Sequence, residues 1–303
     1  MKKLLLTYIL TIGISAVAGA GVGVVLKRTI GPIDEMYPPG FDPKEFSPNI
    51  TEIMDKYNGL SDKSFNGVKS WPDSDVVNVV LEKYRNLDNC YSIGIGNAYT
   101  IITQTIRNAQ IKNGDTYFEE QISYSDMVNV AKRSIQKGAD GKIELYNGKS
   151  SGPEKATYPN SPSATYTPKK YKNYLGKTLD EMFIYIISEK TTLDSTRTTV
   201  GDEVKIALDL NPNLSTYYYK TQMKNISGLS NLPPFSEVKL TYTFSKDKLM
   251  LKHLSVDETF TATKEGIPVP AKTQNKIETY YYPNEFKQIP SSSEMVDYSI
   301  KEV

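Results

Sequence analysis

The 303-residue sequence has only one cysteine (Cys90), one histidine (His253) and one tryptophan (Trp71). A single cysteine excludes an intrachain disulfide and a cysteine-based zinc site, and a single histidine excludes a metal site built from several imidazoles. The charge is nearly balanced, with 36 Lys and Arg against 35 Asp and Glu, so no net field attracts nucleic acid. These absences predict a chain with no metal, no cofactor and no nucleic-acid partner.

The same scarcity argues against an enzyme. His253 is the only imidazole base, and its parity in a predicted strand is opposite to that of Leu254, so we expect it to face solvent. Cys90 has no basic neighbour in the sequence and is expected to be a buried, inert thiol. No G-x-S-x-G motif occurs. Adjacent carboxylates in strands point to opposite faces, so a wall hydrolase with a carboxylate pair is the least favoured interpretation.

The one long uncharged run covers residues 4–26, between two pairs of basic residues. As a helix, these 23 residues are about 35 Å long, enough to cross a hydrocarbon core of about 30 Å. Small residues at 16–18 also fit a cleaved signal peptide, but the apolar run continues well beyond them. We predict an uncleaved signal-anchor over 1–28 that crosses the cell membrane once and leaves the body outside the cytoplasm.

Composition then divides the remaining chain. Residues 29–72 are rich in Pro, Gly, Asp and Asn, which predicts a semi-rigid spacer with one short helix from Ile50 to Tyr57. Residues 73–290 are predicted to form one extracytoplasmic domain, and residues 291–303 a C-terminal tail.

Within that domain, apolar spacing and capping residues predict four helices. The first begins at Asp73 and continues to Leu87, and the others are expected over 125–137, 182–187 and 215–227. Residues 147–173 lack a periodic pattern and are predicted to be a long loop, either a lid or disordered.

Strict alternation of apolar and polar residues predicts that the rest is sheet. Asn113-Gly114 is the strongest hairpin signal and joins a strand over 99–112 to one over 116–124. The other expected strands are 142–146, 203–210, 238–245, 249–261 and 276–282. Alternation buries one face and leaves the other wet. The predicted fold class is α+β: a large curved antiparallel sheet, half-barrel-like, with a few packed helices, preceded by one N-terminal transmembrane helix.

This order of elements resembles the half-barrel lipoprotein carriers of bacterial envelopes, of the LolA and LprG/LppX type, over roughly residues 75–290. The segments that carry it are the anchor, the capped helix from Asp73, the long strands joined by Asn113-Gly114, a crossing helix over Asp126–Lys137, Leu208-Asp209-Leu210-Asn211-Pro212, the helix with Tyr219, Leu232-Pro233-Pro234-Phe235 and the hairpin Thr243–Glu258. The resemblance implies a curved sheet around helices that encloses an apolar cavity for acyl chains. The chain departs from it by having a predicted spanning helix where many members carry a lipidated cysteine. A tethered body cannot shuttle lipid, which favours a sensor, scaffold or local acceptor.

Two interpretations of function stay open, and both give the bilayer as a partner through residues 4–26. In the first, the domain binds an apolar or amphiphilic envelope ligand in a half-barrel cavity, without catalysis. Inward parity assigns to that cavity or its rim Tyr219, Met223, Phe244, Val256, Glu258 and Phe260. Lys252 shares that parity, so a buried Lys252–Glu258 pair is a further option. In the second, a cell-wall glycan or an envelope protein is bound by tyrosine-rich loops, through Tyr166, Tyr171 and Tyr174.

Overall fold

The computed structural model describes residues 41–281, apart from 101, 127–128, 139, 183, 228–231 and 265–266. The helices are η2 (Pro43–Glu45), α2 (Ile50–Asn58), α3 (Phe65–Val68), α4 (Asp73–Arg85), α5 (Pro168–Leu175) and α6 (Tyr217–Ser227). The strands are β1 (Asn89–Tyr99), β2 (Thr103–Asn113), β3 (Thr116–Tyr124), β4 (Asn129–Lys137), β5 (Ile143–Gly152), β6 (Lys155–Thr157), β7 (Ala164–Tyr166), β8 (Thr192–Val200), β9 (Glu203–Leu210), β10 (Phe235–Ser245), β11 (Leu251–Lys264) and β12 (Ile267–Tyr281). The predicted span over 4–26 and the tail over 291–303 lie outside these residues. No helix among the described residues is long and apolar enough to cross a bilayer.

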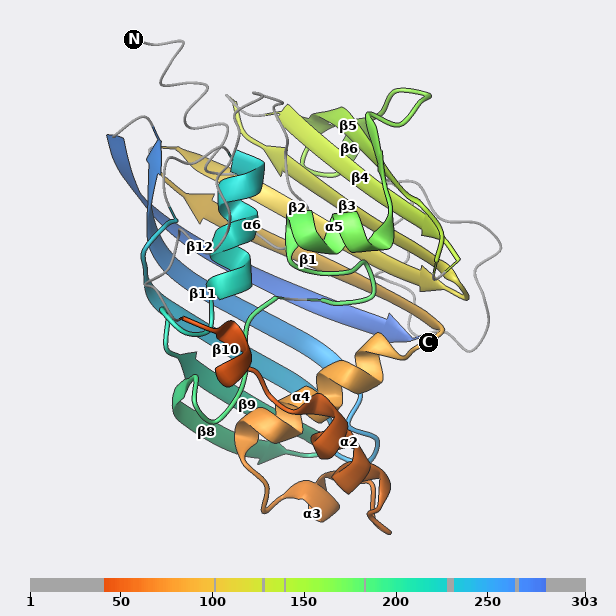
Figure 1. Cartoon of the computed structure of the whole chain (residues 1–303), viewed down its shortest axis with the longest axis vertical. Helices are drawn as coiled ribbons and strands as arrows, with labels where there is room; N and C mark the ends of the chain where they lie inside the picture. The colour runs from red at the N-terminus through yellow and green to blue at the C-terminus, as the bar shows by residue number, and fades with distance from the viewer. Residues whose placement is uncertain are drawn as a thin grey trace.

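The twelve strands form one open sheet in the order β6-β5-β4-β3-β2-β1-β12-β11-β10-β9-β8, with β7 paired to β5 (Figure 1). Every pairing is antiparallel, and β12 returns from the end of the domain to lie between β1 and β11. The prediction of an antiparallel α+β fold is therefore confirmed, with sheet as the dominant part.

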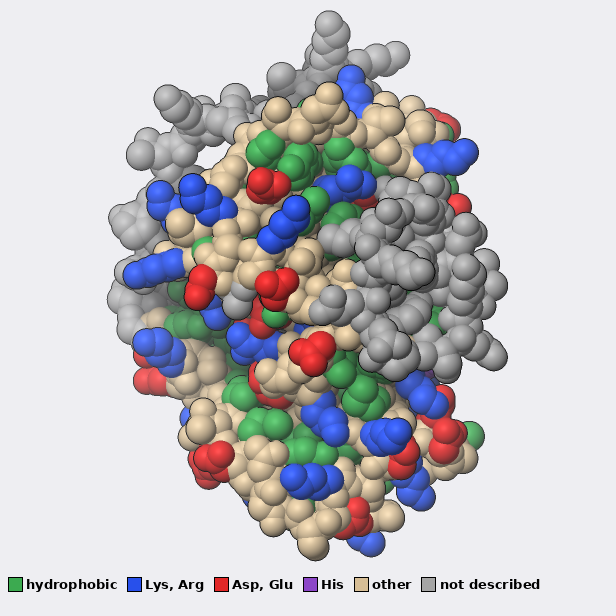
Figure 2. Space-filling model, turned by 90° about the vertical axis from the view of Figure 1, so that its right-hand side faces the viewer, with side chains coloured by type: hydrophobic (Ala, Val, Ile, Leu, Met, Phe, Trp, Pro, Cys, Tyr) green, Lys and Arg blue, Asp and Glu red, His purple; other side chains and the backbone are tan. Residues whose placement is uncertain are grey.

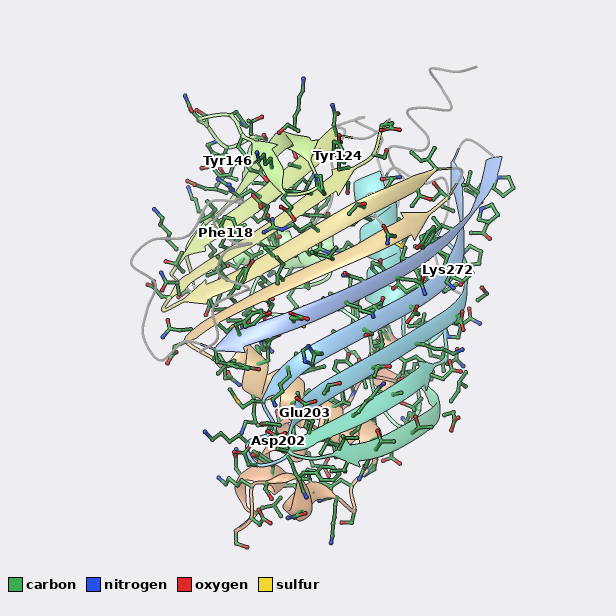
Figure 3. All side chains as sticks on the ribbon, turned by 180° about the vertical axis from the view of Figure 1, so that it is seen from behind. Phe118, Tyr124, Tyr146, Asp202, Glu203 and Lys272 are labelled. Atoms are coloured by element: carbon green, nitrogen blue, oxygen red, sulfur yellow. The ribbon has the colours of Figure 1, made fainter. Side chains whose placement is uncertain are left out.

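The helices α2, α4, α5 and α6 lie on one face of the sheet, which we call the inner face (Figure 1). Figure 3 views the opposite, outer face, on which Phe118 and Tyr146 project. Over the side of the molecule seen in Figure 2, basic and acidic side chains are interspersed among the residues that are coloured. This mixture agrees with the balanced composition.

Residues 41–72 are packed against the sheet. Ile53, Tyr57, Phe65 and Val68 are buried in the main core, and the Phe65 amide donates to the Lys246 carbonyl oxygen at 2.8 Å. The Pro and Gly content of this stretch predicts a spacer. The apolar side chains placed between those residues nevertheless pack into the core. The folded body thus includes residues from 41 onward, ahead of the domain start expected at 73.

The helix predicted over 125–137 is wrong, because Asn129–Lys137 is strand β4. Ala131 and Ile135 fit a helical stripe, but in the sheet they lie on the outer face opposite Ile122 and Phe118. The segment pairs with β3 along one edge and with β5 along the other. Hydrogen bonds on both edges outweigh a local helical pattern that is only partly apolar.

Two further predictions are corrected. Residues 147–173 are not a structureless loop: they contain the end of β5, then β6, β7 and α5. No helix forms over the described residues among 182–187, although the Thr178 amide donates to Glu181 Oε2 at 3.0 Å, one half of the expected capping box. The capping bond forms without a helix. The described residues that follow it are irregular, and their apolar side chains Ile184, Ile186 and Ile187 are buried.

Several local predictions are confirmed. Gly114 has φ of 60° at the predicted hairpin, a conformation that glycine adopts without strain. The helices begun at Ile50, at Asp73 and near residue 215 are α2, α4 and α6. The sequence pattern missed β8, an edge strand whose side chains are mostly exposed and which therefore has no apolar alternation.

Candidate functional site

The inner face has two halves of opposite character. From β9 to β11 it is largely apolar, with Ile206, Tyr242 and Leu254 side by side across three strands. From β1 to β5 it is polar, with Lys132, Gln121 and Asn108 side by side across β4, β3 and β2. The boundary is β12, whose inner face carries the polar Thr279 and Asn275 as well as the apolar Ile277. We call these the apolar half and the polar half.

The six residues predicted to line a cavity lie in the apolar half and are all buried. Five of them belong to one hydrophobic core, and Glu258 is buried beside it. The Tyr219 ring lies 5.6 Å from that of Phe235, which stacks on Phe260 with ring centroids 4.9 Å apart. Phe244 lies at the other end, against Phe65 at 6.3 Å. Met223 and Val256 belong to the same core. These side chains are therefore in contact with neighbouring core residues, and packing accounts for them.

Glu258 is the exception among the six, since it is a carboxylate beside that core. Its Oε2 accepts from Thr273 Oγ1 at 2.7 Å and from the Tyr219 hydroxyl at 3.4 Å. Burial raises the pKa of Glu258 to about 8. The suggested pair with Lys252 is wrong: Lys252 Nζ bonds Glu203 Oε1 at 2.9 Å. The register shift between Thr243 and Phe244 moves Lys252 off the inward parity.

The tyrosines expected to make loop contacts are in or next to α5. Tyr171 is buried, and its hydroxyl donates to Ser134 Oγ at 3.3 Å. Tyr166 packs edge-on against Tyr171 and stacks on Tyr174 with centroids 5.9 Å apart. The three rings therefore seat α5 on the sheet.

In the polar half, one row of side chains is fully hydrogen-bonded. This bonded row crosses five strands and consists of Ser134, Glu119, Gln110, Ser92 and Thr279. Lys177 Nζ donates to both oxygens of Glu119, at 3.0 and 2.9 Å. Gln110 accepts from the Tyr84 hydroxyl at 2.6 Å and donates to the Glu181 carbonyl at 3.2 Å. Ser92 and Thr279 bond to each other at 3.1 Å.

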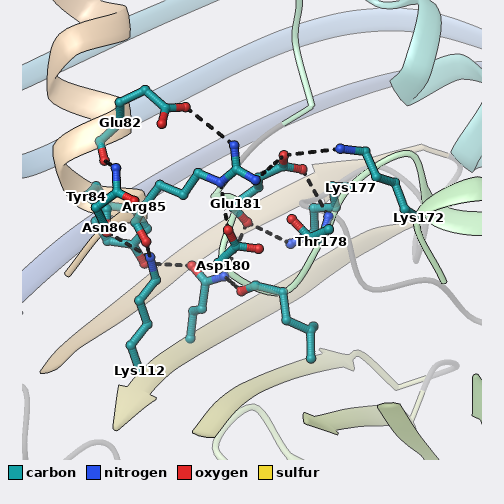
Figure 4. Close-up of polar contacts among 12 residues, drawn as sticks. Glu82, Tyr84, Arg85, Asn86, Lys112, Lys172, Lys177, Thr178, Asp180 and Glu181 are labelled. Carbon is teal, nitrogen blue, oxygen red and sulfur yellow. Dashed lines mark hydrogen bonds and ion pairs between the residues drawn. The ribbon is translucent and has the colours of Figure 1, made fainter. Parts of the chain in front are cut away.

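The cover over this row is itself cross-linked (Figure 4). Arg85 at the end of α4 donates to Asp180 Oδ2 at 2.7 Å, and Lys172 of α5 lies 3.7 Å from Glu181. Lys112 Nζ donates to the carbonyl oxygens of Tyr84 and Arg85 at 2.7 and 2.9 Å. The end of α4, residues 177–182 and the sheet are thereby held together by polar bonds, and the lysine that joins α4 to the sheet, Lys112, is fully buried.

One step further along the strands, the polar side chains lack such partners. Lys132 Nζ, Ser123 Oγ and both side-chain polar atoms of Gln104, Asn108 and Asn275 are buried with no hydrogen bond to the described residues. Lys132 and Asn108 flank Gln121 in one row, and Ser123 and Asn275 lie in the next. We call these the open cluster: Lys132, Asn108, Gln104, Ser123 and Asn275.

The open cluster is electrostatically anomalous because of Lys132. Its side chain is only 1 % exposed, and burial lowers its pKa well below the usual range. A buried charge without a partner costs several kcal/mol, and buried polar groups in native proteins are nearly always bonded. A buried titratable group that is perturbed by desolvation and lies beside other polar groups without partners is a candidate functional residue.

Glycines and a small cavity connect the open cluster to the apolar half. Gly96 faces inward on β1, and a Cβ there would stand 2.2 Å from the Gln274 carbonyl oxygen and 2.9 Å from Asn275 Oδ1. A cavity of about 30 Å³ lies next to Asn108, between Gly94, Ile277 and the 177–182 segment. That volume holds about one water molecule.

A wider hollow of about 530 Å³ lies between α2, α4 and the β10–β11 turn, lined by residues such as Met54 and Met250. Its inner polar groups are already bonded: Lys83 Nζ donates to the Tyr57 hydroxyl at 3.3 Å, and that hydroxyl donates to the Lys63 carbonyl at 2.9 Å. This hollow therefore has less unused bonding capacity than the open cluster.

The candidate base and the candidate thiol of the sequence, His253 and Cys90, differ in their surroundings. His253 is exposed, as predicted, and Cys90 is buried with a pKa raised to about 11 by burial, so neither is positioned as a nucleophile–base pair. No group of three or more metal-ligating side chains occurs among the described residues. Comparison with protein-family models and with curated proteins finds no match to this chain.

Sequence reasoning missed the open cluster because it placed 125–137 in a helix. With β4 in the sheet, Lys132 falls on the inner face next to Gln121. A signal was present: β2 and β3 carry Gln, Asn, Glu and Ser at alternate positions that a half-buried strand would give to apolar residues.

Proposed function

We propose that this chain is a membrane-anchored, non-enzymatic binding domain outside the cytoplasm, whose half-barrel-like sheet takes an amphiphilic envelope ligand on its inner face. The polar half holds the polar end of that ligand, and the apolar end points toward the boundary at Ile277. The observation that carries this proposal is the open cluster, because a buried set of unpartnered donors and acceptors lowers its free energy by bonding a ligand.

The apolar half supports this orientation. Valines of α4 at positions 76, 77, 79 and 80 are buried in the core, so helix side chains already fill the apolar half. The open cluster, whose groups lack hydrogen-bond partners among the described residues and could bind a ligand, lies in the polar half and at its boundary. A tethered acceptor or sensor needs to hold the head of a ligand more than to enclose its whole tail.

The proposal is tested by native mass spectrometry of the full chain, purified from its membrane in mild detergent and followed by extraction of bound compounds. We expect a ligand of defined mass at near one copy per chain. Asn108→Leu fills the open cluster and is expected to lower that occupancy at least tenfold. Asn97→Leu, the same change on the outer face of β1, is the matched control and keeps the ligand. An empty wild-type chain, or equal occupancy in both variants, overturns the proposal.

Membrane anchoring is tested separately. Full-length chain is expected to stay with the membrane fraction after a carbonate wash, and protease added outside intact cells is expected to digest the body. Release by carbonate, or complete protection of the body from outside protease, contradicts the anchored extracytoplasmic placement.

A further inference from the structure

Lys132 lies on the inner face of β4, between neighbours that cannot neutralise it. In register, it faces Gln121 on β3 and Asn147 on β5, both uncharged amides. Of the carboxylates on the adjacent strand, Glu119 is bonded through both oxygens to Lys177. Glu120 is on the outer face, where it pairs with Arg107 at 3.3 Å and Arg133 at 3.2 Å.

These pairings leave the side-chain nitrogen of Lys132 buried without a counterion among the described residues. Burial lowers its pKa and so favours the neutral amine until an anion is present. Glu119 and Glu120 already have their own cations, so a pairing of Lys132 with either of them would have to compete with an existing ion pair. A charge held this way is unfavourable in the empty protein and becomes favourable when an anion enters.

The other members of the open cluster also offer donors. Asn108 and Gln104 each carry a free amide NH₂, and Ser123 carries a hydroxyl. Neighbouring strands are about 4.8 Å apart, so Lys132 and Asn108 lie on either side of Gln121, about 10 Å apart at the backbone. A phosphate or carboxylate group has several acceptor oxygens and can receive hydrogen bonds from both sides, with lysine acting as a point charge.

We propose that Lys132 is the anchor of a buried oxyanion site, in which its ammonium group and the Asn108 amide together hold one phosphate or carboxylate group of the ligand over Gln121. This inference rests on the proposed function and specifies its ligand as anionic. From that group the row continues through Gly94 to Ile277, so the remainder of an anionic amphiphile runs over β1 toward the apolar half.

The test uses the full chain in detergent micelles, titrated with phosphatidylglycerol or phosphatidylcholine and measured by native mass spectrometry. Lys132→Met removes the charge while keeping length and volume, and Lys137→Met, at the exposed end of the same strand, is the matched control. We expect wild type and Lys137→Met to prefer phosphatidylglycerol at least tenfold, and Lys132→Met to lose that preference. Lipids collected by the N-terminal segment are common to all three chains and cancel in the comparison.

A second arm separates a lipid headgroup from a free anion. Inorganic phosphate is added at constant ionic strength, and its protection of the chain against thermal unfolding is compared between wild type and Lys132→Met. Protection of wild type alone supports the oxyanion site with a small anion as its ligand, and lipid preference without phosphate protection supports the same site with a headgroup. Identical behaviour of wild type and Lys132→Met in both arms overturns the inference.

The two proposals fail in distinguishable ways. A wild-type chain that carries a neutral ligand, kept in Lys132→Met and lost in Asn108→Leu, leaves the binding domain standing and overturns the oxyanion site. A wild-type chain without any ligand, from membrane or from titration, overturns both.

Discussion

The bonded row and the open cluster are adjacent on the same face of the same strands, and they have similar residue types. In the bonded row, Glu119 has Lys177 and Gln110 has Tyr84. In the open cluster, Lys132 and Asn108 have no such partners among the described residues. The difference is in the cover: α4, α5 and residues 177–182 supply partners for one row and not for the next. Polar side chains in the first stabilise the fold, and those in the second are the ones for which we propose a role in binding.

The largest effect is expected where the bonded row is broken. Lys177→Met leaves Glu119 buried without its cation, which is expected to lower the free energy of unfolding by about 3–5 kcal/mol. Denaturant unfolding of the full chain in detergent, followed by the fluorescence of the single tryptophan, Trp71, measures this. Trp71 is buried in the core and reports on the body.

The double variant Lys177→Met/Glu119→Leu is the control, because removing both charges leaves no unpaired group and recovers most of the loss. A loss below about 1 kcal/mol in the single variant would mean that the bonded row does not serve folding, and the contrast with the open cluster would disappear.

Glu258 is a buried carboxylate in the apolar half, and it allows a test of how burial of a titratable group there affects stability. The folded pKa of Glu258 is about 8, above its usual value near 4.5. The folded state therefore binds more protons than the unfolded state between those pH values, so its stabilising effect is complete at low pH and declines as pH rises toward 8. We expect this one group to contribute a slope of about −1.4 kcal/mol per pH unit in that window.

Glu258→Gln is expected to remove that slope while keeping the shape of the side chain. Unfolding free energies at pH 5, 6, 7 and 8 measure it in both chains. Equal slopes for wild type and variant would show that Glu258 is ionised or exposed in the folded protein.

How far the sequence predicts this molecule also differs between the two halves. In the apolar half, strands such as Glu203–Leu210 alternate strictly, and both their bounds and their buried face followed from the pattern. In the polar half, both faces are buried and the inner one is polar, so the alternation that marks a strand is weak. Asn129–Lys137 was therefore mistaken for a helix, and with it the inward direction of Lys132 was lost.

The candidate site was harder to predict than the fold for a related reason. Parity correctly placed Glu258, Val256 and Phe260 on the inner face, but parity does not tell a packed side chain from one that lines a site. Partners decide that, and they come from residues distant in sequence: Lys177 reaches Glu119 from 58 positions away. The residues next to Lys132 in the sequence do not reveal that its amine lacks a partner in the described part of the fold.

The boundary between the halves can be tested through its glycines. A Cβ on Gly94 would stand 2.7 Å from Ile277 Cγ1 and 3.2 Å from the Asn275 amide, so Gly94→Ala is expected to destabilise the body by about 1–3 kcal/mol through overpacking. Gly152→Ala is the control, since nothing lies within 4 Å of its Cβ position. Urea midpoints from Trp71 fluorescence compare the two. Equal midpoints would mean that β1 and β12 separate readily at the boundary.

The smallest effect has the opposite sign, and it decides whether the open cluster differs in kind from the bonded row. Lys132→Met replaces an unpartnered buried amine by a thioether of similar length, which is expected to raise the unfolding free energy of the ligand-free chain by about 1 kcal/mol. Lys177→Met is the same substitution on a neighbouring buried lysine and lowers it. Opposite signs for the same substitution would mean that Lys177, which pairs with Glu119 of the bonded row, stabilises the fold. Lys132 would then be retained at the expense of stability, as binding residues often are. If Lys132→Met also lowers the unfolding free energy, Lys132 has a structural partner and belongs with the bonded row.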